Sequence, residues 1–106
     1  GVVVQLMNTM RYEKEIGLDR TFVYAGDSKI PFDVDGKFTE GFIADIQQSV
    51  DFFYEEFTSF VASNRNLSVQ QVKDTQAKVY LPTEALSLGL VDKVMTKQEF
   101  INYAFS

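Results

Sequence analysis

Residues 38–64 read FTEGFIADIQQSVDFFYEEFTSFVASN and form the clearest pattern in the chain. Apolar side chains recur there at spacings of three and four residues, as on one face of an amphipathic helix. Thr39 is the expected N-cap, and Asn64 to Asn66 are expected to end the helix. Such a helix rises about 38 Å at 1.5 Å per residue, more than the diameter of a globule this small. We therefore expect part of the apolar stripe to pack outside the chain, against a missing segment or another subunit, and we favour a homo-oligomer contact through residues 38–64.

Shorter segments on both sides of this helix predict an α/β fold. Apolar, β-branched runs favour strands, and further helices are indicated by capping residues, proline and glycine at suitable positions. The expected strands are 1–6, 21–25, 78–81 and 91–94. The expected short helices are Met10 to Ile16 ended by Gly17, Val69 to Thr75 capped by Ser68, one begun by Pro82 and ended by Gly89, and a terminal one capped by Thr96.

The composition excludes several classes of chemistry. The chain has 106 residues, of which 45% are apolar, with ten Phe and five Tyr, so it is long and apolar enough for one folded domain. It has no Cys, which excludes disulfides, thiol catalysis and thiolate metal sites. It has no His, which removes a Ser-His-Asp triad and the commonest zinc ligand. Catalysis by this chain must therefore use Ser, Thr, Lys, Tyr, Asp or Glu.

The net charge and the lengths of the apolar runs limit which partners we expect for this chain. A net charge of -5 disfavours nucleic-acid binding, which relies on basic residues. No run of about 18 apolar residues predicts a membrane-spanning helix. The opening GVVVQLM is short and lacks a basic start, so it is not expected to be a signal peptide. Because the chain opens directly on an apolar run, we expect Gly1 to follow a missing segment.

At this point the residues resemble a known family, the C-terminal half of the signal peptide peptidase A family. The closest likeness is to its phage branch, the head-maturation proteases similar to minor capsid protein C. The order and spacing of the matching pieces, rather than any single piece, make the resemblance specific. Those pieces are Val50-Asp51, Tyr54, Phe57, Val61, Asn64-Arg65 and Leu67-Ser68, then Val79-Tyr80, Glu84-Ala85-Leu86 and Gly89-Leu90-Val91-Asp92, with Gly1-Val2-Val3-Val4 similar to a family strand.

The resemblance implies both a fold and a chemistry. The fold is the Clp protease/crotonase spiral of strand-strand-helix units, of which residues 1–106 would be a single partial domain. The family uses a Ser-Lys dyad, and its serine and oxyanion-hole glycines lie upstream of Gly1. Its lysine follows a strand like Tyr24-Ala25-Gly26, which places the general base at Lys29. Leu81-Pro82 departs from the family pattern in a way that need not affect chemistry.

Lys29 has an alternative interpretation, as a solvated loop lysine. To be a base at neutral pH its pKa must fall from about 10.4 to about 7–8, which requires desolvation. Residues 30–32 (Ile-Pro-Phe) supply an apolar wall, whereas Asp27 and Asp33 raise the pKa unless they point outward. Ser28 is interpreted as a turn residue rather than a nucleophile.

No cofactor or metal site is expected from the sequence. Asp33-Val34-Asp35-Gly36 resembles the start of a calcium loop, but the twelfth position from Asp33 is Ala44, not the Glu that an EF-hand needs. This stretch is interpreted as a polar turn before the long helix. Asn64-Arg65-Asn66 is interpreted as a helix end, not an anion site.

Three functions remain open at this stage. The first is the C-terminal part of a serine endopeptidase, inactive alone, acting in phage prohead maturation or signal-peptide-type degradation. The second is a non-catalytic crotonase-like module for oligomerisation or capsid assembly. The third, an acyl-CoA-type crotonase fragment, ranks last because no CoA-binding loop is seen. The localisation stays open, with a cytoplasmic or prohead-associated place expected for the phage branch.

Overall fold

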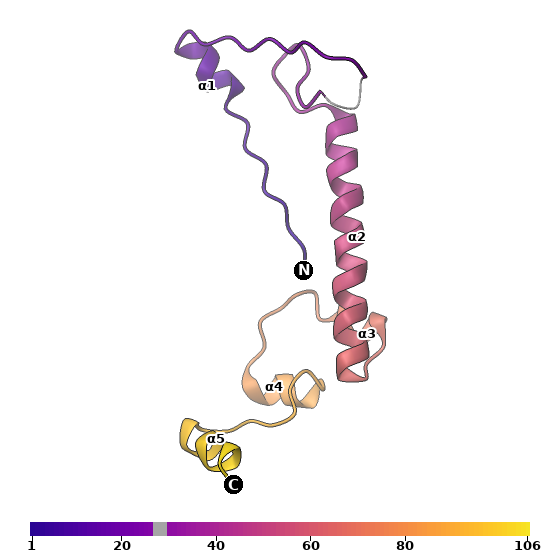
Figure 1. Cartoon of the computed structure of the whole chain (residues 1–106), viewed down its shortest axis with the longest axis vertical. Helices are drawn as coiled ribbons and strands as arrows, with labels where there is room; N and C mark the ends of the chain where they lie inside the picture. Colours follow the sequence, from indigo (N-terminus) through magenta and orange to yellow (C-terminus); the bar gives the residue numbers. More distant parts are fainter. Residues whose placement is uncertain (27–29) are drawn as a thin grey trace. The chain divides into compact units, whose positions relative to one another are not determined.

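The computed structural model describes residues 1–26 and 30–106, and helices are its main regular elements (Figure 1). Contacts divide the chain into two units, Gly1–Glu56 and Phe57–Ser106, with the boundary inside the longest helix. The helices are α1 Met10–Glu15, α2 Glu40–Arg65, α3 Val69–Asp74, α4 Pro82–Ser87 and α5 Lys97–Ala104. All five agree in position with the helices predicted from the sequence.

The N-caps predicted at Thr39, Ser68 and Thr96 are present as hydrogen bonds. Thr39 Oγ1 accepts from the backbone N–H of Phe42 at 3.3 Å at the start of α2. Ser68 Oγ accepts from the N–H of Gln71 at 3.1 Å, and Gln71 Oε1 accepts from the N–H of Ser68 at 2.8 Å, which completes a capping box on α3. Thr96 Oγ1 accepts from the N–H of Glu99 at 3.1 Å and starts α5 in the same way.

Three helices end in the same left-handed turn. The turning residues are Gly17 after α1, Asn66 after α2 and Gly89 after α4, with φ of 89°, 54° and 78°. After each one, the N–H of a leucine donates to the carbonyl five residues earlier, at 2.8 to 3.0 Å. This is the Schellman arrangement, which satisfies carbonyl groups that the helix leaves unpaired. The helix ends predicted at these three positions are confirmed.

The second unit, Phe57–Ser106, has a small buried centre where α3 lies against the C-terminal end of α2 (Figure 1). The buried side chains of the described residues are Thr58, Ala62 and Val72, with exposures of 1%, 5% and 7%. Arg65 at the end of α2 reaches across this unit. Its Nε donates to the Gly89 carbonyl at 2.9 Å, and its terminal nitrogen pairs with Asp92 Oδ1 at 2.8 Å. Arg65 therefore has a structural role within this unit.

The four segments expected to be strands, 1–6, 21–25, 78–81 and 91–94, are not strands in this structure. In the described parts of the chain, the β-pairing is a single antiparallel bridge between Phe32 and Phe38. A strand needs a neighbouring strand to accept and donate its backbone hydrogen bonds, and no such neighbour lies along these segments. The α/β spiral of strand-strand-helix units, and a single partial domain over 1–106, remain predictions.

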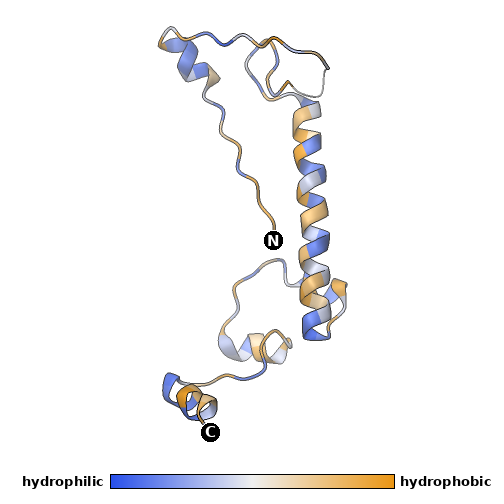
Figure 2. Ribbon diagram, in the orientation of Figure 1, coloured by the Kyte–Doolittle hydropathy of each residue, from blue (hydrophilic) through white to orange (hydrophobic). Residues whose placement is uncertain are grey.

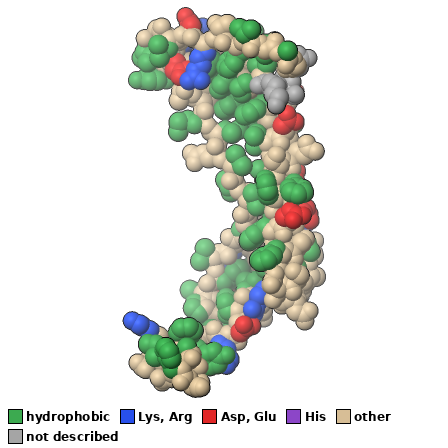
Figure 3. Space-filling model, in the orientation of Figure 1, with side chains coloured by type: hydrophobic (Ala, Val, Ile, Leu, Met, Phe, Trp, Pro, Cys, Tyr) green, Lys and Arg blue, Asp and Glu red, His purple; other side chains and the backbone are tan. Residues whose placement is uncertain are grey.

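Large hydrophobic side chains lie exposed in both units (Figure 3). On α2, hydrophobic and hydrophilic residues alternate along the helix (Figure 2). Phe52, Phe53, Phe57 and Phe60 are 60%, 58%, 48% and 68% exposed. Within residues 1–26 and 30–106, no helix has both the length and the apolar character needed to cross a bilayer.

Removing the capping box should destabilise α3 specifically. We expect Ser68→Ala to lower the free energy of unfolding by about 1 kcal/mol, because the Gln71 N–H loses its acceptor. Ser63→Ala is the control, since Ser63 Oγ only donates back to the carbonyl of Phe60 within α2. Urea unfolding followed by circular dichroism measures both. Equal stability of Ser68→Ala and the native chain would contradict the cap assignment.

The Arg65–Asp92 pair should make stability depend on pH. The hydrogen bond from Arg65, and then its charge, hold the pKa of the Asp92 carboxyl below its ordinary value. A lowered folded-state pKa stabilises the fold above the unfolded pKa of about 3.9, and the contribution disappears as pH falls through the folded pKa. We expect Asp92→Asn to lower the melting temperature at pH 6 and to match the native chain in strong acid. Asp45→Asn, which removes a carboxylate at an exposed position of α2, is the control.

Candidate functional site

The predicted base, Lys29, and its neighbours Asp27 and Ser28 lie outside the described residues. The described chain resumes at Ile30, whose carbonyl accepts a hydrogen bond from Thr39 Oγ1 at 2.8 Å. The backbone N–H of Thr39 donates to the Pro31 carbonyl at 2.9 Å. The two residues that follow Lys29 are therefore bound to the residue that caps α2.

Residues 31–39 form a tight turn directly after the predicted base. The N–H of Asp33 donates to the Lys37 carbonyl at 2.8 Å, and the N–H of Gly36 donates to the Asp33 carbonyl at 3.1 Å. Asp33 Oδ1 accepts from the N–H groups of Asp35 and Lys37 at 2.9 and 3.0 Å. The polar turn expected here is present, and one carboxylate oxygen of Asp33 is used by the backbone. The described residues contain no cluster of three or more potential metal ligands.

A cleft of about 940 Å³ lies within the first unit, beside this turn. Three parts of the chain line it: α1, the segment from Leu18 to Tyr24, and the turn from Ile30 to Thr39. Tyr24 and Ile30 stand shortly before and directly after the segment that contains Lys29. The apolar lining comes mainly from Leu18, Phe22, Ile30, Phe32 and Val34.

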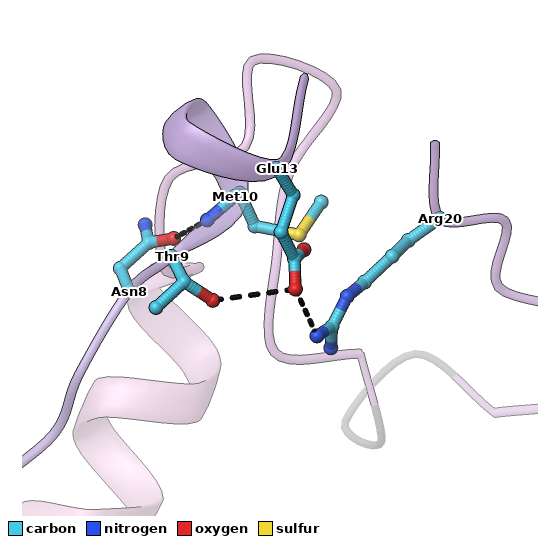
Figure 4. A network of polar contacts seen from close by, with 5 residues as sticks. All are labelled: Asn8, Thr9, Met10, Glu13 and Arg20. Carbon is cyan, nitrogen blue, oxygen red and sulfur yellow. Dashed lines mark hydrogen bonds and ion pairs between the residues drawn. The ribbon is translucent and has the colours of Figure 1, made fainter. Parts of the chain in front are cut away.

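One wall of the cleft carries an ion pair that sequence reasoning missed (Figure 4). Glu13 Oε1 contacts a terminal nitrogen of Arg20 at 2.5 Å and accepts a weaker hydrogen bond from Thr9 Oγ1 at 3.4 Å. The hydrogen bond to Glu13, followed by its charge, raises the pKa of the Arg20 guanidinium. The Glu13 side chain is 16% exposed, and its Oε2 is buried with no hydrogen-bond partner in the described structure.

Asn8 joins the cleft wall to the turn and was likewise missed as a site residue. Its side-chain oxygen accepts from the N–H of Met10 at 2.9 Å at the start of α1 (Figure 4). Its amide nitrogen donates to the Gly36 carbonyl at 2.7 Å, 28 residues away. No local sequence pattern predicts this contact, because its two residues are 28 positions apart along the chain.

Comparison with known proteins gives a match over nearly the whole chain. Residues 1–105 match the family described as "Peptidase family S49". The chain is 29% identical to "Putative protease slr0021" of Synechocystis sp., over 98% of this chain and 38% of that protein. It is 28% identical to "Capsid assembly protease C" of Escherichia phage lambda, over 95% and 23%. It is 29% identical to "Head-tail preconnector protein GP5" of Enterobacteria phage P21, over 96% and 20%.

The chain thus spans between a fifth and two fifths of the length of these relatives. Two of the three are named as proteases, and two are phage proteins named for capsid assembly or for the head-tail junction. The family match covers both units and the segment with Lys29. It confirms the resemblance to peptidases, including phage head proteins, that the sequence motifs indicated. This chain belongs to peptidase family S49.

Proposed function

We propose that this chain is the C-terminal portion of a serine endopeptidase with a Ser-Lys dyad, in which Lys29 is the general base. The nucleophilic serine comes from outside residues 1–106. The family match over residues 1–105 carries the peptidase assignment. The cleft in the first unit, which Tyr24 and Ile30 help to line, supports a substrate site in this part of the chain.

The proposed reaction follows the ordinary course of acyl transfer. The neutral amine of Lys29 takes the proton from the serine hydroxyl, and the serine oxygen attacks the peptide carbonyl. The resulting ammonium gives the proton to the leaving amine, and an acyl-enzyme ester remains. Lys29 then takes a proton from water, whose oxygen attacks the ester carbonyl. The serine oxygen leaves and takes that proton from Lys29, so the serine hydroxyl and the neutral amine are restored.

This role requires a poorly hydrated amine, and the described neighbours are compatible with that. Ile30, Pro31 and Phe32 are all half-buried and apolar. Asp33 is the nearest described acid along the chain, and one oxygen of its carboxylate accepts two backbone N–H groups of its own turn.

The substrate class follows from the phage relatives as part of the same proposal. One of them is named for capsid assembly and another for the head-tail connection. We propose cleavage of head proteins during prohead maturation, with signal-peptide-type degradation as the other substrate class of the family resemblance.

A second candidate function is a non-catalytic module that assembles through α2. The observation that favours it is the row of exposed phenylalanines from Phe52 to Phe60. An exposed apolar face of this kind is typical of a surface that another chain covers. The two functions are alternatives as regards catalysis, whereas homo-oligomerisation through residues 38–64 is compatible with either of them.

Replacement of Lys29 tests the catalytic proposal. In the complete reading frame that encodes residues 1–106, Lys29→Ala should lower kcat/KM for a peptide substrate by roughly 10²- to 10⁴-fold, since the serine loses its base. Lys29→Arg should be equally inactive, because a guanidinium keeps its proton at neutral pH. Lys97→Ala is the control, since Lys97 is an exposed lysine of α5. Activity of Lys29→Ala equal to that of Lys97→Ala would remove Lys29 from this role.

A charge on the α2 face tests the assembly candidate. Phe60→Glu should lower the mass measured by light scattering toward that of a single chain, because a carboxylate would be desolvated in the contact. Phe105→Glu is the matched control, on a phenylalanine that is 87% exposed outside α2. A native chain that is monomeric at all concentrations would end the assembly proposal.

A further inference from the structure

A second cavity, of about 540 Å³, lies in the unit Phe57–Ser106 at the start of α5. Its walls come from the connection that precedes α5 and from two aromatic side chains of the helix, Phe100 and Tyr103. These two residues are 59% and 57% exposed. Basic and hydrophobic side chains gather in this part of the chain (Figure 3). A cavity of this size with aromatic walls is large enough to receive side chains of a partner.

The α5 cavity carries a positive charge that is held in place. The Lys93 ammonium lies 4.2 Å from the centre of the Tyr103 ring, in a cation–π contact that keeps it over the aromatic wall. Asp92 also lines the cavity, but its carboxylate pairs with the Arg65 guanidinium at 2.8 Å. The charge of Asp92 is thus compensated from within the unit. The cavity therefore suits a partner that presents an anionic group beside apolar rings.

Such a group is present on α2, in the unit Gly1–Glu56. Glu56 follows Phe52 and Phe53 by four and three residues, so the three side chains lie on one side of the helix. All three are exposed. The two phenylalanine rings lie 5.5 Å apart between centroids, in an edge-to-face arrangement. These three residues form an acidic aromatic patch that matches the α5 cavity in both charge and ring content.

We propose that the acidic aromatic patch of one copy of this chain docks into the α5 cavity of a second copy, with Glu56 against Lys93. This inference rests on the assembly candidate described above and names its two contact surfaces. At a net charge of -5, two copies repel each other at long range, so their contact needs local groups of opposite sign. The patch and the cavity supply these groups. An α2–α2 contact would instead leave the α5 cavity unused.

Charge reversal on either surface tests this contact. In the complete protein that contains residues 1–106, Lys93→Glu should raise the dissociation constant for self-association roughly tenfold, because two carboxylates then oppose each other. Glu56→Lys should do the same by bringing two ammonium groups together. The double variant Lys93→Glu/Glu56→Lys restores opposite charges and should associate within about threefold of the native protein. Light scattering over a concentration series measures all three.

Two further lysine variants separate the contact from effects on the fold. Lys78 offers the matched control, since its ammonium lies 5.2 Å from the centre of the Tyr80 ring, in the same unit and outside the α5 cavity. Lys78→Glu should leave self-association unchanged. Lys93→Arg keeps a cation that can stack on Tyr103 and should associate as the native protein does. Circular dichroism checks that each variant retains its helix content.

The outcomes distinguish this inference from the assembly candidate on which it rests. If Phe60→Glu dissociates the protein and Lys93→Glu does not, assembly through α2 stands and the role of the α5 cavity is overturned. A native protein that stays monomeric overturns both. A double variant that fails to restore association contradicts the pairing of Glu56 with Lys93 and assigns the two surfaces to other partners. An equal loss in Lys78→Glu would reduce the effect to net charge and contradict the pairing as well.

Discussion

The backbone N–H and carbonyl groups at helix ends need hydrogen-bond partners, and the rest of this structure depends on that requirement. Among the described residues only Thr58, Ala62 and Val72 are buried, so apolar packing alone stabilises little of the chain. Each helix still leaves N–H and carbonyl groups unpaired at its ends. Thr39, Ser68 and Thr96 accept at the starts, and left-handed turns close three of the ends. These local bonds decide where the helices begin and where the chain turns toward the cleft.

The same constraint explains how much could be predicted from the sequence. Helix ends depend on residues within one turn of each other, so Ser68 or Gly89 signals its role without knowledge of distant parts. Strands depend on partners far along the chain, and the apolar runs at 1–6 and 21–25 carry no information about which partner they meet. The predicted α/β spiral therefore remains a prediction, whereas all five helices are confirmed.

Lys29 came from a family motif and stays a prediction, because it lies outside the described residues. The structure shows a cleft lined in part by Tyr24 and Ile30, which the sequence did not predict. The Glu13–Arg20 pair in the cleft wall has no motif, because it forms only when the turn at Gly17 brings the two side chains together. The Asn8–Gly36 hydrogen bond spans 28 residues, and no sequence motif predicts it either. Family membership could thus be indicated from the sequence, whereas these two contacts are seen only in the structure.

The bond from Arg65 to the Gly89 carbonyl has a consequence for how the chain tolerates length variation. The Arg65 guanidinium binds a carbonyl 24 residues later in the chain, so this bond closes a loop of that length. The entropic cost of closing a flexible loop grows only with the logarithm of its length. Extra residues placed near Gln76 and Ala77, in the exposed connection between α3 and α4, would thus disturb the closure little. Natural or engineered insertions, such as a short epitope or a reporter peptide, are best accommodated there.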